Sequence, residues 1–144
     1  MPTIIKSILL LLAIVVLASC KSSAPKNAFT QEAGLFKVAI LYPGGEGKFF
    51  DMAYYEKTHM PLVAAYLGKN LKYYEIDRGV SGRSPEEKAP YVAVGYFYVY
   101  DLGAYHQAIA QNREAIVGDI KNYTNILPTV QISEIKKLAY NPVK

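Results

Sequence analysis

Apolar stretches alternate with polar, glycine-rich and proline-rich stretches along most of the chain, and they predict six elements. Two stretches are apolar on both alternating faces, which is typical of strands covered on both sides, and two others alternate with charged residues mixed in. Two segments, 52–67 and one from about 101 to 116, carry apolar residues at helical spacing. The predicted strands are 35–43, 71–79, 91–100 and 129–138.

The order strand, helix, strand, strand, helix, strand is that of the ferredoxin-like βαββαβ arrangement. We therefore expect an α+β fold with a four-stranded antiparallel sheet, in a domain spanning residues 35–140. This topology places the first and third strands in the middle of the sheet. The first and third strands are also the two that lack a mixture of acidic and basic residues, so the hydrophobic pattern of the sequence agrees with this topology.

The third predicted strand is apolar on both faces, although two helices can cover only one face of the sheet. A second copy of the chain would cover the other face, which predicts a homodimer. The alternative is a monomer whose strand tyrosines keep their hydroxyl groups in water.

The first residues resemble an export signal, because Lys6 precedes an apolar run over 8–17 that is short for a membrane span. The run ends in "LASC", which resembles a bacterial lipobox and implies cleavage before Cys20 and lipidation of that residue. We expect a signal peptide over 1–19, a flexible tether over 20–34 and attachment to a membrane. Lys21 indicates the periplasmic face of the outer membrane, by resemblance to sorting rules. The alternative is a signal anchor with an incidental cysteine.

Composition excludes several kinds of site. Cys20 is the one cysteine, so lipidation would leave no thiol for a disulfide, a nucleophile or a metal ligand. The formal net charge is only +4, and the basic residues form no stripe with aromatic residues, so we expect no nucleic acid partner. The two histidines fall on different helices without a carboxylate cluster, and we expect no metal.

His59 is the candidate catalytic residue. It lies within the apolar stripe of the first predicted helix, two residues before Pro61, and should point toward the sheet. Small residues at Ala93 and Gly95 would leave room for a cavity beside it. An enclosed imidazole is suited to acid or base catalysis, because its ordinary pKa is near neutrality. The alternative is that His59 donates to a backbone carbonyl freed by Pro61 and only fills space.

The chain has 13 tyrosines, and most of them are expected in the core or an interface. Some could contact a flat ligand through the ring face and the hydroxyl group. We predict Tyr42, Tyr55 and Tyr66 as the ligand-lining residues. Asp119 and Tyr123, in "DIKNYT", either order the loop before the last strand or close one end of the cavity.

The segments "FKVAILYP", "DMAYYEKTHMPLV", "PYVAVGYFYVYDLGAYHQAI" and "GDIKNYTNILPTVQISEI" together resemble the EthD family, over residues 36–135. The most specific part surrounds His59, which matches the family's histidine. The resemblance implies a ferredoxin-like subunit paired as a dimeric α/β barrel. It also implies chemistry on small aromatic or polyketide-like molecules, often without a cofactor.

Two functions follow as hypotheses. The first is a lipid-anchored protein that binds a small, mainly apolar or aromatic molecule, with His59 moving a proton in an isomerisation, dehydration or cyclisation that needs no cofactor. The second is a non-catalytic lipoprotein of the cell envelope that holds a ligand or assists a neighbouring enzyme.

Overall fold

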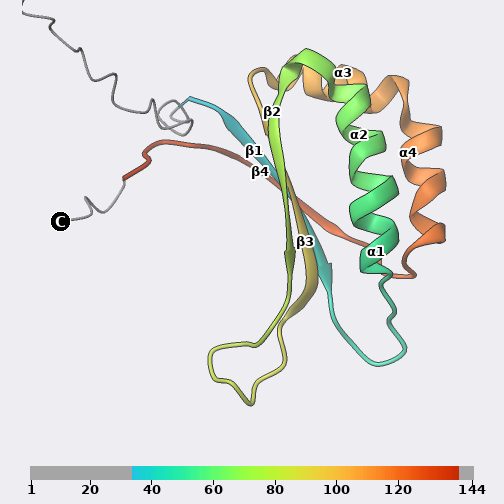
Figure 1. The fold of residues 1–144 in the computed structure, drawn as a ribbon. Coiled ribbons are helices and arrows are strands. Elements are labelled where there is room, and N and C mark those ends of the chain that lie inside the picture. Colours follow the sequence, from blue (N-terminus) through green and yellow to red (C-terminus); the bar gives the residue numbers. More distant parts are fainter. Residues whose placement is uncertain (1–33, 140–144) are drawn as a thin grey trace, which may run out of the picture. The chain divides into compact units, whose positions relative to one another are not determined.

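The computed structural model of the protein describes residues 34–139, which form one four-stranded antiparallel sheet with helices on one face (Figure 1). The strand order is β2-β3-β1-β4, so the first and third strands lie in the middle, as predicted. The α+β ferredoxin-like fold is therefore confirmed. The strands are β1 (Phe36–Pro43), β2 (Leu71–Arg78), β3 (Tyr91–Val99) and β4 (Thr129–Glu134).

The first predicted helix is one continuous helical segment with three geometries. It begins as α1 (Met52–Tyr54), widens into the π-helix η1 (Tyr55–His59) and continues as α2 (Met60–Leu67) and the 3-10 turn η2 (Gly68–Asn70). The wide turn lies just before Pro61, which has no N–H to donate to the preceding turn. The N–H of Met60 instead donates to the carbonyl of Tyr55, five residues back.

The start of this segment follows from its sequence. The side chain of Asp51 accepts a hydrogen bond of 3.0 Å from the N–H of Tyr54 and so caps the helix. The rings of Phe50 and Tyr55, on either side of this cap, lie 5.0 Å apart between centroids and form a hydrophobic staple.

The second predicted helix is divided in two, as α3 (Leu102–Gln111) and α4 (Arg113–Asp119), followed by the 3-10 turn η3 (Ile120–Asn122). The break is at Asn112, whose side chain donates to the carbonyl of Ala108 at 2.8 Å and competes with the helix backbone. The last strand is also shorter than predicted. It ends at Glu134 because its partner there, Phe36, is the first residue of β1.

The core lies between the helices and the central strands. The space above Gly95 is not the expected cavity, because the hydroxyl group of Tyr55 and the methyl group of Met60 fill it. On the opposite face of the sheet, apolar side chains share the surface with charged ones. The ammonium group of Lys37 lies over the ring of Tyr96, and the hydroxyl group of Tyr98 donates to Glu75 at 2.9 Å.

Within residues 34–139, no helix combines the length and apolar character needed to cross a bilayer. The same range contains no group of three or more histidine, cysteine, aspartate or glutamate residues placed to hold a metal ion. The predicted signal peptide, Cys20 and all but the last residue of the predicted tether lie outside the described residues.

Candidate functional site

The described structure pairs His59 with a carboxylate. Nδ1 of His59 lies 2.9 Å from Oδ2 of Asp119, although the two residues are 60 positions apart in the chain. His59 comes from the end of η1 and Asp119 from the end of α4, so the pair joins the two helical segments above the sheet. The His59 side chain is 6% exposed and that of Asp119 is 12% exposed.

The other oxygen of Asp119 is held by two more donors. The hydroxyl group of Tyr54 donates to Oδ1 at 2.7 Å, and the side-chain amide of Asn122 donates to the same oxygen at 2.8 Å. Asn122 reaches it because η3 turns the chain back immediately after Asp119. The carboxylate is therefore fixed in position and presents Oδ2 to the imidazole.

These contacts set the protonation of the pair. Burial lowers the pKa of His59 below its ordinary value of 6.5 and outweighs the opposing effect of the Asp119 carboxylate. Burial acts to raise the pKa of Asp119, but the hydrogen bonds from His59, Tyr54 and Asn122 together lower it below 3.8. At neutral pH the site then holds an ionised carboxylate and a neutral imidazole. Since the carboxylate only accepts, the imidazole proton is on Nδ1 and Nε2 is free to accept a proton.

Tyrosine rings surround the imidazole on the core side. The Tyr123 and Tyr55 rings lie 4.5 Å and 5.6 Å from the His59 ring, centroid to centroid. Tyr123 also shares a hydrogen bond of 2.8 Å with the hydroxyl group of Tyr42. Burial raises the pKa of all three tyrosine hydroxyl groups, so they remain neutral hydrogen-bonding groups. We call Tyr42, Tyr55 and Tyr123 the tyrosine cluster.

The predicted ligand-lining residues do not lie at one open surface. Tyr42 and Tyr55 are 2% and 1% exposed, whereas Tyr66 is half-buried on α2 and packs against the core. The other histidine, His106, is exposed on α3. The alternative considered for His59 was a hydrogen bond to a backbone carbonyl. Nδ1 of His59 instead pairs with Asp119.

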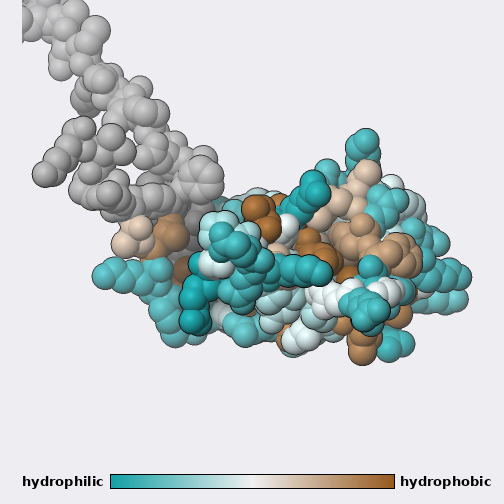
Figure 2. Space-filling view, turned by 90° about the horizontal axis from the view of Figure 1, so that it is seen from below, coloured by the Kyte–Doolittle hydropathy of each residue, from teal (hydrophilic) through white to brown (hydrophobic). Residues whose placement is uncertain are grey.

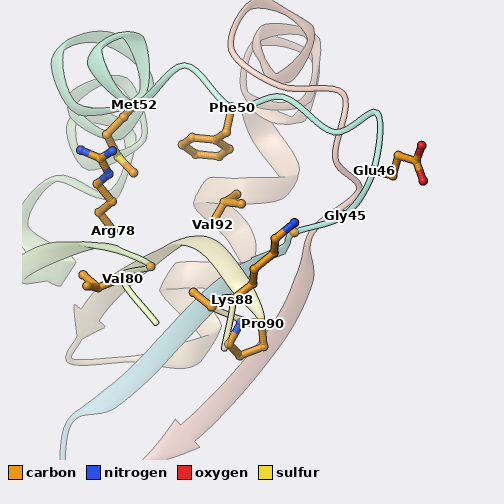
Figure 3. Close-up of a pocket in the computed structure, with 12 residues that line it drawn as sticks. Gly45, Glu46, Phe50, Met52, Arg78, Val80, Lys88, Pro90 and Val92 are labelled. Atoms are coloured by element: carbon orange, nitrogen blue, oxygen red, sulfur yellow. The ribbon is translucent and has the colours of Figure 1, made fainter. Parts of the chain in front are cut away.

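A cleft of about 960 Å³ lies at the end of the sheet, between the β1–α1 and β2–β3 loops (Figure 3). His59 does not line it. Phe50 does, and its ring also contacts the tyrosine cluster, with centroids 4.8 Å from Tyr42 and 5.5 Å from Tyr123. The cleft and the imidazole are therefore separated by a layer of aromatic rings.

Tyr54 and Asn122 are the site residues that the sequence analysis did not identify. In a regular α-helix, side chains five residues apart point about 140° away from each other, which would place Tyr54 and His59 on different faces. The wider π turn between them rotates them toward one side, and both reach Asp119. The only sequence signal for this turn was Pro61.

Residues 47–126 match the model of the EthD domain family, a range that includes His59, Asp119 and Tyr123. An EthD-like protein from Ralstonia eutropha JMP134 is 39% identical, with a TM-score of 0.69; the match covers 72% of this chain and 93% of that one. An ethyl tert-butyl ether D (EthD) family protein from Bacillus halodurans C-125 is 24% identical, with a TM-score of 0.53, covering 69% and 97%. The second likeness supports the fold alone. No protein with a curated description matches the sequence.

Proposed function

The chain belongs to the EthD family, and from this premise we propose that it binds a small, mainly apolar or aromatic molecule on which His59 acts as a proton-transfer group. The observation that carries this proposal is the second titratable group within hydrogen-bond reach of the imidazole, Asp119. A histidine that only filled space would not need a carboxylate held by two further donors.

Each partner has a definite role in the proposed proton transfer. Nε2 of His59 accepts a proton from the ligand, and the Asp119 carboxylate stabilises the imidazolium ion that forms. Tyr54 and Asn122 act as positioning residues because they hold the carboxylate. The imidazolium then returns the proton to a different atom of the ligand, as an isomerisation, dehydration or cyclisation requires. None of these steps requires a cofactor.

Access to Nε2 requires a movement, because His59 is 5% exposed. Phe50 lies between the cleft and the tyrosine cluster and is the side chain best placed to move when a ligand enters. The three predicted ligand-lining tyrosines, Tyr42, Tyr55 and Tyr66, would then contact the ligand through their rings.

The test is proton exchange on the bound ligand. Small molecules that copurify with the protein are identified by mass spectrometry, and each is incubated with the protein in D₂O while NMR follows deuterium incorporation. We expect incorporation with the native protein, a loss of at least about a hundredfold with His59→Asn, and no change with His106→Asn, which removes an exposed imidazole on α3. Exchange at an undiminished rate in a folded His59→Asn protein would remove the proposed role.

The second candidate function is non-catalytic: the protein binds a ligand without converting it, or acts as an accessory subunit of a neighbouring envelope enzyme. The observation that favours it is the burial of His59 behind aromatic rings. In that case the His59–Asp119 pair ties α4 to the first helical segment. Ligands would then bind without deuterium incorporation, and His59→Asn would reduce stability while native and variant proteins both showed no exchange.

We also propose that the protein is a homodimer attached to the periplasmic face of the outer membrane through a lipidated Cys20. The dimer would bury the sheet face without helices, where Ala39, Leu41 and Val94 form an apolar strip beside Tyr96 and Tyr98. The expected sedimentation velocity is that of a dimer, and Leu41→Glu should give monomers. Cys20→Ala should release the protein from membranes, in a fractionation of cells that make the full chain.

A further inference from the structure

We propose that the cleft at the end of the sheet is a binding site for a small organic anion, with an apolar or aromatic body and one carboxylate group that Arg78 binds. The cleft is separate from the His59–Asp119 pair, so this proposal does not depend on proton transfer by His59.

The cleft has an apolar floor. Phe50 and Met52 contribute to it from the start of the first helical segment, and Val92 from β3 (Figure 3). Seen from this end of the molecule, apolar side chains reach the surface in patches among hydrophilic ones (Figure 2). A flat ring placed against this floor would bury apolar area from water, which is the usual source of affinity in a small-molecule site.

Two cationic side chains border this floor. Arg78, at the end of β2, extends toward Met52, and Lys88 extends from the β2–β3 loop toward Gly45 (Figure 3). Neither side chain forms an ion pair or a hydrogen bond with another residue of the range 34–139. The acidic residue of the cleft, Glu46, lies at its far edge with the carboxylate directed away from Phe50 and Val92. The charged residues that line the cleft are thus two cations, Arg78 and Lys88, and one anion, Glu46.

The walls of the cleft are tied together by the backbone. The N–H of Gly44 donates to the carbonyl of Pro90 at 3.0 Å, and the N–H of Gly79 donates to the carbonyl of Val92 at 3.0 Å. Gly79 permits this close approach, because a Cβ atom at that position would overlap the carbonyl oxygen of Tyr91. The strand end that carries Arg78 is thus held in place, which limits the backbone entropy lost when a ligand binds.

The chemistry of Arg78 favours a carboxylate. Its planar guanidinium group can donate two parallel hydrogen bonds to the two oxygens of a carboxylate, and it is more weakly hydrated than an ammonium group. Next to the apolar floor water is partly excluded, so the attraction between the guanidinium group and the carboxylate is stronger than in bulk water. Inorganic phosphate has no apolar body to occupy the floor and should bind less well.

Naphthalene-2-carboxylate is a suitable probe, and ¹⁵N-labelled full-length protein reports its binding by NMR titration. The amide shifts should localise to the loops around residues 44–46 and 79–90. Arg78→Gln should weaken binding of the probe about fivefold or more. The control is Arg83→Gln, which removes an exposed arginine of the β2–β3 loop outside the cleft and should leave the affinity within about twofold of that of the native protein. The uncharged naphthalene-2-methanol should bind as weakly to the native protein as the carboxylate does to Arg78→Gln.

Three results would overturn the proposal. These are shift changes scattered over the surface, equal affinity of the Arg78→Gln and Arg83→Gln proteins, or equal binding of the carboxylate and the alcohol. The His59→Asn protein separates this proposal from the proposed function. It should bind the probe with unchanged affinity, so a failure of proton transfer alone would leave the anion site intact.

Discussion

Gly95 in the middle of β3 gives the sharpest test of how the core supports the site. A Cβ atom at this position would overlap the hydroxyl oxygen of Tyr55, and it would lie 3.2 Å from Cζ of that ring and 3.3 Å from Cε of Met60. The Met60 side chain is flexible, but the Tyr55 ring is 1% exposed and is enclosed by Phe50 and Tyr42. The ring must therefore shift as a rigid body, and with it the π-helix that carries His59.

The expected cost of Gly95→Ala follows from two contributions. Overfilling a packed core costs about 1–3 kcal/mol. Disturbing the buried hydrogen bond between the Tyr42 and Tyr123 hydroxyl groups, whose rings pack against that of Tyr55, adds about 1 kcal/mol. Replacing glycine in a strand returns about 0.5–1 kcal/mol of backbone entropy. The net expectation is a free energy of unfolding lower by about 1–3.5 kcal/mol.

Equilibrium urea unfolding, followed by tyrosine fluorescence and circular dichroism, measures this change. Gly118→Ala is the matched control, because Gly118 lies in α4 with no atom near its added Cβ. That substitution should stabilise the protein by up to about 1 kcal/mol. If Gly95→Ala also stabilised the protein, the space above Gly95 would be empty, and the packing described for Tyr55 would be wrong.

Three further predictions concern the site and its helix. The pKa of His59 is lower in the folded protein than in the unfolded chain, so the unfolded chain binds a proton first as the pH falls. The melting temperature should therefore decrease as the pH drops below about 6.5. In His59→Gln this decrease should be smaller, because the variant has no imidazole to titrate there. Tyr54→Phe removes one donor to Asp119, which should lower the midpoint of urea unfolding and raise the pKa of Asp119, measured by carboxyl ¹³C NMR. Asp51→Ala should cost about 1 kcal/mol by loss of the helix cap, whereas Asp51→Asn should be nearly neutral.

The sequence was sufficient for the fold because each element carried a local signal that agreed with the topology. The apolar residues on both faces of β1 and β3 indicated that these strands lie in the middle of the sheet. Asp51 caps the first helical segment, and Phe50 and Tyr55 pack together on either side of this cap. Such signals depend on neighbours in the chain, so a single sequence contains them.

The candidate site was predicted only in part. The helical stripe placed His59 toward the core, which the structure bears out. Its partner Asp119 is 60 residues away, and nothing local marks a contact at that distance. The predicted cavity above Gly95 was wrong, because the hydroxyl group of Tyr55 fills that space. The position of this side chain depends on how the π-helix packs on the sheet, which a single sequence does not specify.

The measurement closest to the central claim is the tautomer and titration of the His59 ring, observed by long-range ¹H–¹⁵N NMR. We predict that at pH 7 the ring is neutral with its proton on Nδ1, that Nε2 is unprotonated, and that the titration midpoint lies below 6.5. The Asp119→Asn protein should no longer show this fixed tautomer. A ring with its proton on Nε2, or one already charged at pH 7, would contradict the proposed proton acceptor.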